Sequence, residues 1–521
     1  MYGSGMEMPK VSFASIDFSQ IPAGSYFVGF DLDSAGALSK MDSTGAITLV
    51  EGAGGGVIDV DSGVNSTYRI DNNNTASGDY STVSGGYTNT ASGYGSIVSG
   101  GSGNTAGGAG DLNFVGGGYI NTASGYYSTV AGGAYNDASL DYSTVSGGYN
   151  NAAANIASTV SGGYGNSATG LGSTIGGGVN NTSSAYCSTV GGGFNNTANG
   201  CFSTVSGGYG NTASGYCSTV SGGYGNTASG YCSTVSGGYG NTASNYYSTV
   251  SGGYTNTASS YSSSVSGGKS NTASGEYSTV SGGYGNTASG RCSMTGGGFT
   301  NTASGYHSTV SGGYFNLSSG KCSTVSGGYC NTASNYHSTV SGGCINTASG
   351  CCSTIGGGYC NTASGVGSLV SGGYSNTVSD NYSTISGGRG NIANNDYSTV
   401  SGGCSNTASG AYSTIGGGRA NTASCNYSTV GGGCSNTASG CCSIVGGGYQ
   451  NTASGNYSGI LGGIGNSTNL LAYSFIVGTS ITADTACTTF VNQLSIKGIP
   501  TSSAGLCSGM LWSDSGKICI V

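Results

Sequence analysis

Charge is scarce in this chain: charged side chains make up 5% of its 521 residues, and the formal net charge is -8. Ten of the 18 acidic residues lie before Tyr80, so the rest of the chain is almost neutral. A nucleic-acid-binding protein would carry a basic stripe or patch, which this sequence lacks. No apolar run reaches the roughly 18 residues of a membrane span, so no membrane insertion is expected.

Proline and tryptophan are nearly absent, with 3 Pro and 1 Trp, whereas Gly (107) and Tyr (38) are abundant. Collagen requires Gly at every third position together with abundant Pro, and neither condition holds. A flexible Gly/Ser linker would fit the composition. However, a Val or Ile recurs at a fixed place in the sequence, and a disordered chain has no use for a hydrophobic residue held in register.

The patterns of catalytic and metal-binding proteins are also missing. The sequence has no Cys-x-x-Cys pair, no Cys/His spacing typical of zinc, and no Gly-x-Ser-x-Gly nucleophile motif. We therefore expect a protein that is not an enzyme and that holds no cofactor or metal. The first residues, MYGSGMEMPK, lack the charged and then apolar pattern of a secretory signal.

Cysteine is absent before residue 187, all 19 cysteines lie from Cys187 onward, and 16 of them lie inside a repeat region. Many alternate with Tyr or His at one turn position, which holds Cys217 and Cys232 in neighbouring units. Two interpretations stay open. The thiols are free and fill a Tyr-like slot, or stacked pairs such as Cys217 and Cys232, about one strand spacing apart, form disulfides. The odd total leaves at least one thiol unpaired within a chain.

What the sequence does have is a repeat. The unit Asn211 to Gly225 reads NTASGYCSTVSGGYG and recurs almost unchanged from Asn226. Looser copies follow one another from Asn74 to Asn466, and only the unit from Asn104 is longer, by two residues. A fixed short period over most of a chain is typical of solenoid proteins, in which each unit packs only on its neighbours. Fifteen residues fit the helical period of 3.6 poorly, and Gly and β-branched residues are poor helix formers.

We therefore predict an all-β protein, a parallel β-solenoid (β-roll) in which each unit forms one coil of two short strands. Alternation along the strands turns Ala and Val inward and the Thr and Ser pairs outward. The Asn side chains are also expected to point inward, and paired glycines allow positive φ where the chain reverses. The predicted core ladder comprises Asn211, Ala213, Val220, Asn226, Ala228 and Val235.

The repeat limits give the domain organisation. Short alternating runs such as SYFVGFDLD and AITLVEG predict an N-terminal β attachment domain over residues 1–52. A Gly/Asp/Ser-rich linker over 53–73 follows, then the solenoid shaft over 74–478 and a C-terminal β segment over 479–521. End segments that differ from the repeats are expected, because bare solenoid ends expose sheet edges.

The units GGYGNTASGYCSTVSGG resemble the head repeats of YadA-like trimeric autotransporter adhesins. The resemblance covers about three quarters of the chain and implies left-handed β-rolls wound into a homotrimer. The period of fifteen departs from the fourteen usual in that family, and we expect neither a signal peptide nor a C-terminal membrane β-barrel anchor. IPAGSYFVGFDLDSAGALSKMD, TFVNQLSIKGIP and SGMLWSDSGKICIV resemble segments of fibre and tail structural proteins of bacteriophages and giant viruses.

These resemblances imply a structural fibre or spike on a virus or phage particle that presents a repetitive surface for host attachment. The expected location is the virion surface or the extracellular space, and the expected partners are further copies in a homotrimer, virion structural proteins and host-surface glycans. A cell-surface adhesin or extracellular filament protein is the alternative. An ice-binding solenoid is the third possibility, because regular outward Thr rows occur on ice-binding proteins.

Exposed aromatic columns suit the apolar faces of sugars. Packing between chains, or capping of the coil core, would explain the same columns. His307 and His337 share one column two coils apart, with no acidic partner in their own coils, so a metal site is not expected there. The candidate surface-contact residues are Tyr127, Tyr247, His307 and His337.

Overall fold

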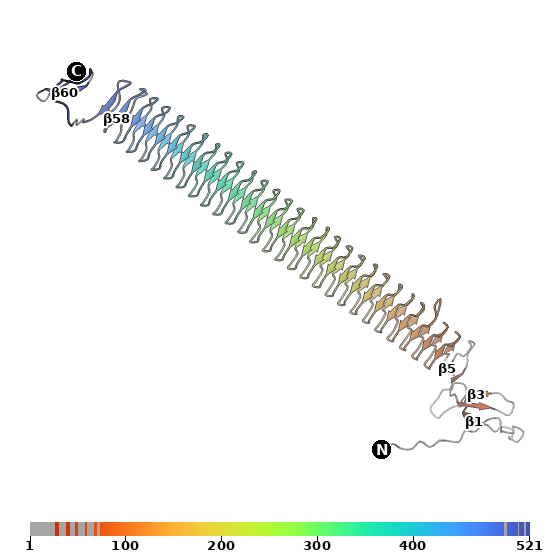
Figure 1. Ribbon diagram of the computed structural model, residues 1–521. Helices are drawn as coiled ribbons and strands as arrows, with labels where there is room; N and C mark the ends of the chain where they lie inside the picture. The colour runs from red at the N-terminus through yellow and green to blue at the C-terminus, as the bar shows by residue number, and fades with distance from the viewer. Residues whose placement is uncertain are drawn as a thin grey trace, which may run out of the picture. The chain divides into compact units, whose positions relative to one another are not determined.

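The computed structural model describes residues 73–493, 497–508, 510–514 and 517–520, and the backbone of five short strands before residue 73. The chain divides into two compact units, a first unit Met1–Gly240 and a second unit Asn241–Val521. Strands and turns make up the described residues, which include no helix. Within each unit the strands stack coil upon coil (Figure 1). The predicted fold, a parallel β-solenoid of fifteen-residue coils, is confirmed.

Each coil contributes two strands of two residues. In the coil that begins at Asn211 these are β24 (Thr212–Ala213) and β25 (Thr219–Val220). β24 pairs in parallel with β26 (Thr227–Ala228), and β25 pairs with β27 (Thr234–Val235). Equivalent residues stand opposite each other, which builds two parallel sheets. The coils run from β6 (Thr75–Ala76) and β7 (Thr82–Val83) in the first unit to β56 (Thr452–Ala453) and β57 (Gly459–Ile460) in the second.

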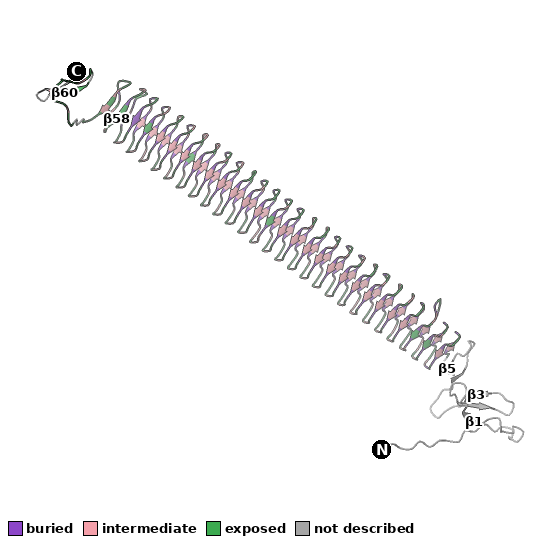
Figure 2. Ribbon diagram, viewed as in Figure 1, coloured by how far each residue is buried: buried purple, intermediate pink, exposed green. Residues whose placement is uncertain are grey.

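The inner space of the coil is filled by small side chains. Ala213 and Val220 are fully buried, as are the polar residues Asn211 and Ser218. The strand threonines face outward and stay partly exposed, so buried and intermediate residues alternate along each strand (Figure 2). Ala228, Val235 and Asn226 are equally buried one coil further on. This places all six residues of the predicted core ladder inside the coil.

The buried Asn side chain links three successive coils. The Asn211 Oδ1 accepts a hydrogen bond from the backbone N–H of Asn226 at 2.9 Å. The Asn211 Nδ2 donates to the carbonyl of Gly207 in the preceding coil and to that of Gly223 in its own coil, both at 2.9 Å. Since a buried amide without partners is costly, this arrangement explains why Asn occupies the position in coil after coil.

The second turn forms a third ladder that the sequence did not predict. Tyr209, Tyr224 and Tyr239 are joined by parallel bridges at a place where only a turn was expected. Close packing of the adjacent glycines permits this ladder. Gly223 has a φ of 91°, and a Cβ atom there would lie 2.1 Å from the carbonyl oxygen of Gly238. No other residue type fits that space.

The first turn reverses through a left-handed residue that is usually not glycine. Cys217 has a φ of 52° and Tyr247 a φ of 56°. Residues branched at Cβ are disfavoured in this conformation. The fifteen-residue column through Cys217 contains no Val, Ile or Thr between Tyr80 and Tyr457. Steric demand at this turn thus limits which side chains line the surface.

The longer unit from Asn104 keeps its place in both sheets. β10 (Thr105–Ala106) and β11 (Phe114–Val115) pair in register with the coils on either side. The two extra residues therefore lie in the first turn, between these strands. This agrees with the extra Gly residues found there in the sequence.

The parallel ladder continues past residues 74–478 in each direction. β5 (Thr67–Arg69) pairs in parallel with β7 and antiparallel with β4 (Ile58–Asp59). β58 (Phe475–Val477) and β59 (Thr489–Val491) extend the sheet of the second unit. The remaining strands pair antiparallel and comprise β1 (Phe27–Phe30), β2 (Leu38–Met41), β3 (Ile47–Leu49), β60 (Leu511–Asp514) and β61 (Lys517–Ile520).

Candidate functional site

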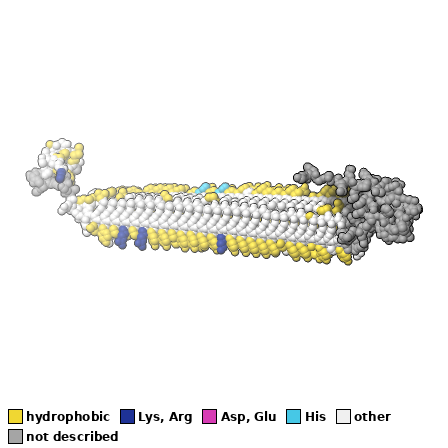
Figure 3. All heavy atoms as spheres, turned by 90° about the horizontal axis from the view of Figure 1, so that it is seen from below, with side chains coloured by type: hydrophobic (Ala, Val, Ile, Leu, Met, Phe, Trp, Pro, Cys, Tyr) yellow, Lys and Arg dark blue, Asp and Glu magenta, His cyan; other side chains and the backbone are white. Residues whose placement is uncertain are grey.

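The two turns of the coil carry the exposed large side chains. With Asn211 counted as position 1, positions 6 and 7 (Tyr216 and Cys217) define the first-turn ridge. Positions 14 and 15 (Tyr224 and Gly225) define the second-turn ridge. Hydrophobic side chains gather along two opposite edges, with a polar band between them (Figure 3). The candidate functional surface is therefore a pair of ridges that repeat once per coil.

Aromatic rings on the second-turn ridge stack face to face. Phe194, Tyr209, Tyr224 and Tyr239 form one such stack, with centroids 4.7–5.0 Å apart and planes within 3° of parallel. The second unit holds another stack from Tyr284 to Tyr329, with spacings of 4.8–5.3 Å. The in-register pairing of the coils sets this spacing, since each coil presents its ring at the same place. This column was missed from the sequence, although Tyr recurs at position 14.

Stacking determines what the rings can offer to a partner. Within a stack each ring face is covered by the ring of the neighbouring coil, which leaves ring edges and hydroxyl groups outward. Tyr224 nevertheless keeps 46% of its surface exposed. Sugar binding through an open ring face is thus confined to the ends of a stack. Along the stack the available contacts are hydroxyl hydrogen bonds and ring-edge packing.

The predicted contact residues all lie on the first-turn ridge and are exposed. Tyr127 stacks on Tyr142 with centroids 5.6 Å apart, and Tyr247 packs edge-on against Tyr261 at 5.7 Å. His307 packs edge-on against Tyr306 at 4.2 Å, and His337 packs in the same way against Tyr336 at 4.1 Å. The structure does not bring the two histidines together with acidic groups. Their role in binding a partner stays a prediction.

The cysteines on the ridges are mostly free thiols. Cys217 and Cys232, the pair singled out from the sequence, are not bonded to each other. Burial raises the pKa of the Cys217 thiol, and the neighbouring thiol of Cys232 raises it further. The thiolate is the reactive form of cysteine, so this shift favours an inert thiol. The interpretation of these cysteines as free thiols is confirmed for this pair.

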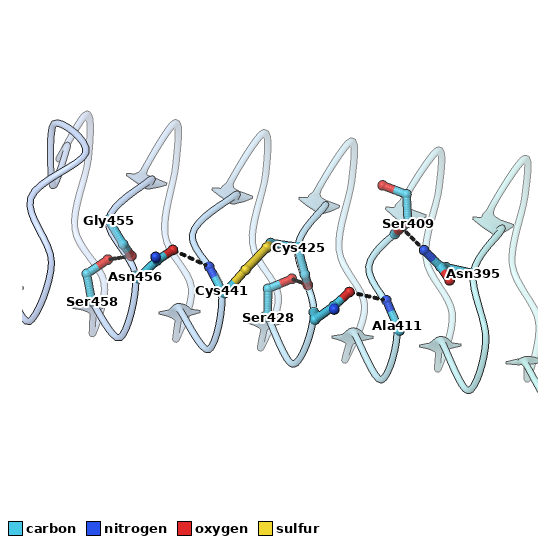
Figure 4. The surroundings of a disulfide bond; sticks show 10 residues. Asn395, Ser409, Ala411, Cys425, Ser428, Cys441, Gly455, Asn456 and Ser458 are labelled. Atoms are coloured by element: carbon cyan, nitrogen blue, oxygen red, sulfur yellow. Dashed lines mark hydrogen bonds between the residues drawn. A yellow bond between two sulfur atoms is a disulfide. The ribbon is translucent and has the colours of Figure 1, made fainter.

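One disulfide joins adjacent coils in the second unit. Cys425 at position 5 is bonded to Cys441 at position 6 of the next coil, with Cα atoms 4.9 Å apart (Figure 4). The Cys441 backbone N–H donates to the Asn456 side chain at 2.9 Å, and the Ser428 hydroxyl donates to the Cys425 carbonyl at 2.6 Å. The sequence predicted pairs of equivalent positions, whereas this bond joins positions sixteen residues apart.

The few charges of the second unit are placed differently on the two ridges. Position 14 carries Lys269, Arg389 and Arg419, and no acidic residue occurs at positions 14 and 15 between residues 254 and 465. The Lys269 ammonium lies 5.1 and 5.6 Å from the ring centroids of the tyrosines above and below it. On the first-turn ridge, Glu276 and Arg291 form an ion pair at 3.0 Å. The Lys and Arg side chains visible in Figure 3 lie on one edge and the histidines on the other, whereas Arg291 and Lys321 belong to the first-turn ridge at position 6.

Among the described residues, no group of three or more His, Cys, Asp or Glu side chains could hold a metal ion. In the same part of the chain, no helix is long and apolar enough to cross a membrane. No protein-family model matches the chain, and no curated protein is significantly similar to it.

Proposed function

We propose that this chain is a structural fibre or spike protein of a virus or phage particle, located at the virion surface or in the extracellular space. It would present a repetitive β-solenoid surface for host attachment. The observation that carries the proposal is the pair of exposed aromatic ridges, repeated once per coil over a core of buried Asn, Ala, Ser and Val side chains. The resemblance of the end segments to viral fibre and tail proteins supports the viral setting.

The mechanism that follows is multivalent contact. A surface that repeats the same weak site many times binds a repeating partner by avidity, and no single strong pocket is needed. Host-surface glycans are the proposed ligands, because phenolic hydroxyls and ring edges suit their hydroxyl-rich chains. We further propose that the protein assembles as a homotrimer and docks on virion structural proteins. The adhesin-like repeats support the trimer.

Immunogold labelling tests the proposed setting. An antibody raised against the coil peptide of residues 211–225 would be applied to cultures that produce the protein, with antibody absorbed on the same peptide as control. Gold on released particles is the expected result. Gold confined to the cell envelope would instead support a cell-surface adhesin or extracellular filament and would overturn the viral assignment.

The outward threonine rows favour ice binding as a second candidate function. Thr212 and Thr219 lie on the two outward faces, and both are partly exposed. Ser214 and Ser221 replace the second Thr of each row and lack the methyl group that would complete an ice-like array. Thermal hysteresis of the purified chain measures this activity directly. Its absence at millimolar concentration would eliminate the candidate.

A further inference from the structure

The two ridges of the second unit are unlike each other, and this asymmetry suggests what covers them. Both expose aromatic side chains: Tyr284 and Tyr314 on the second-turn ridge are 42% and 39% exposed. Continuous exposed apolar surface marks an interaction site. Because the ridges repeat once per coil, a partner that contacts many coils at once needs the same repeat. A second copy of this chain has that repeat.

We infer that copies of this chain pack with the second-turn ridge of one against the first-turn ridge of the next. The copies run parallel and are shifted by one coil. This inference is independent of the proposed viral role, because it rests on the ridges alone. It is a contact separate from the proposed trimer, whose closed symmetry has no axial shift between copies, and it names the surfaces and the register involved.

The charged residues select the one-coil shift. Lys269 belongs to the coil that starts at Asn256, and Glu276 to the coil that starts at Asn271. Arg389 and Asp396 belong to the coils that start at Asn376 and Asn391, so the same shift relates them. Among shifts of minus one, zero and plus one coil, only plus one sets two of the three second-turn cations, Lys269 and Arg389, opposite a first-turn carboxylate.

The same shift also suits the other basic residues of the two ridges. It sets Arg291 opposite Tyr284 of the next copy, and Lys321 opposite Tyr314, where a cation on an aromatic ring is favourable. Arg419 falls opposite the Asn426 side chain, which offers a carbonyl oxygen. No two like charges face each other. The two ridges lie on opposite edges of the coil (Figure 3). Each of these pairings therefore brings one edge of a copy against the opposite edge of its neighbour.

Present intrachain contacts leave these side chains accessible. Lys269, Glu276 and Arg389 are exposed, and Asp396 is partly exposed. The Glu276 side chain, which pairs with Arg291, keeps 51% of its surface exposed. The Asp396 carboxylate accepts the backbone N–H of Asn381 at 3.2 Å. Each carboxylate can accept further hydrogen bonds, so a cation from a second copy can be added without breaking the contacts already made.

A contact between two different surfaces is heterologous. Because each copy is shifted by one coil along the shaft, the shifts of successive copies add up, so the contact does not close into a ring and continues side by side. In this contact the aromatic ring edges bury apolar surface and supply most of the affinity. The charged pairs fix the register, because complementary charges contribute mainly to specificity.

Charge reversal in the full chain tests the contact and its register. The solution mass of the parent is measured by light scattering and sedimentation at low salt, over a range of concentrations. Lys269→Glu places two carboxylates opposite each other and is expected to weaken assembly at least about tenfold. The double variant Lys269→Glu with Glu276→Lys restores opposite charges and is expected to restore the mass. Lys497→Glu reverses the charge of an exposed lysine that lies outside both ridges, so it is the matched control and leaves the mass unchanged.

The outcomes separate the possibilities. An antiparallel contact would bring Lys269 opposite Asp396 instead, so recovery in Lys269→Glu with Asp396→Lys, and not with Glu276→Lys, overturns the parallel register. A parent that is monomeric at every concentration, or a Lys269→Glu variant that assembles like the parent, overturns the contact itself. Thermal unfolding of each variant shows that these surface changes leave the coil intact, because exposed ion pairs contribute little to stability.

Discussion

The backbone N–H of Asn226 donates to the side-chain Oδ1 of Asn211 at 2.9 Å, and both residues are fully buried. The contact recurs within each unit, for example between Asn89 and Asn74 and between Asn466 and Asn451. Together with the bonds that the Asn211 Nδ2 donates to the Gly207 and Gly223 carbonyls, it ties the buried backbone of successive coils together. The Asn side chains therefore connect each coil to the next, and they also connect the second turn to the strand that follows it.

Replacing this amide by its closest isostere should loosen the coil locally. Asn211→Asp removes the Nδ2 donors from the Gly207 and Gly223 carbonyls and adds a buried carboxylate. We expect a loss of about 2–4 kcal/mol in the free energy of opening this part of the solenoid. Hydrogen exchange of the Asn226 amide measures it. The neighbouring outward substitution Thr212→Ser is the control, and equal exchange in the two variants would contradict a structural role for the amide.

Two adjacent glycines should respond very differently to the same substitution. Gly208 has a φ of 92°, and a Cβ atom there would lie 2.2 Å from the Gly223 carbonyl oxygen. At Gly207, outside the left-handed region, the nearest atom would be 3.9 Å away. We expect Gly208→Ala to cost about 1–3 kcal/mol of unfolding free energy and Gly207→Ala less than about 0.5. Urea denaturation of the two variants decides, and similar midpoints would refute the argument.

The Cys425–Cys441 bond should be detectable and stabilising. Alkylation of the unfolded chain without reductant should leave these two cysteines unmodified in peptide mass spectra. Cys425→Ser should lower the unfolding free energy of this region by up to about 3 kcal/mol, because a loop of sixteen residues is no longer closed in the unfolded state. Cys217→Ser, which removes a free thiol from an equivalent turn, should change stability little. Complete alkylation without reductant would show that the bond is not formed.

Asp137 gives the first unit a pH-dependent stability. Burial raises the pKa of its carboxyl above the ordinary value, and a hydrogen bond with Ser139 offsets part of this rise. The folded state therefore holds the proton more tightly than the unfolded chain. The contribution of Asp137 to stability is most favourable below the ordinary Asp pKa, near about 4. It falls as pH rises through the raised value.

Asp137→Thr, which introduces the residue found at Thr122 in the preceding coil, should stabilise the chain at pH 7 and have a smaller effect at pH 3. Because the carboxyl is partly exposed, we expect about 0.5 kcal/mol or less at pH 7. Ala152→Thr introduces the same side chain one coil further on, with no titrating group, and serves as the control. Thermal unfolding at both pH values measures the difference. An equal effect of Asp137→Thr at the two pH values would contradict the assignment.

The sequence alone determined the coil. Its fifteen-residue period, the alternation around Ala213 and Val220, and the paired glycines were sufficient to predict two parallel sheets with Asn, Ala and Val inside. These features are local, since they follow from strand alternation, turn chemistry and a constant spacing. Any regular stack of such units puts equivalent residues above one another.

Only the tertiary structure decided which different positions of the fifteen-residue coil come into contact between neighbouring coils. At the first turn the Cys217 N–H donates to the Cys201 carbonyl at 2.9 Å, which joins position 7 to position 6 of the preceding coil. The same offset of sixteen residues brings Cys425 to Cys441, whereas Cys217 and Cys232 stay unbonded. The third ladder through Tyr224 and its stacked rings also depends on how the turn lies against its neighbour. A sequence repeat fixes the spacing of equivalent residues, but the path of each turn sets contacts between different positions.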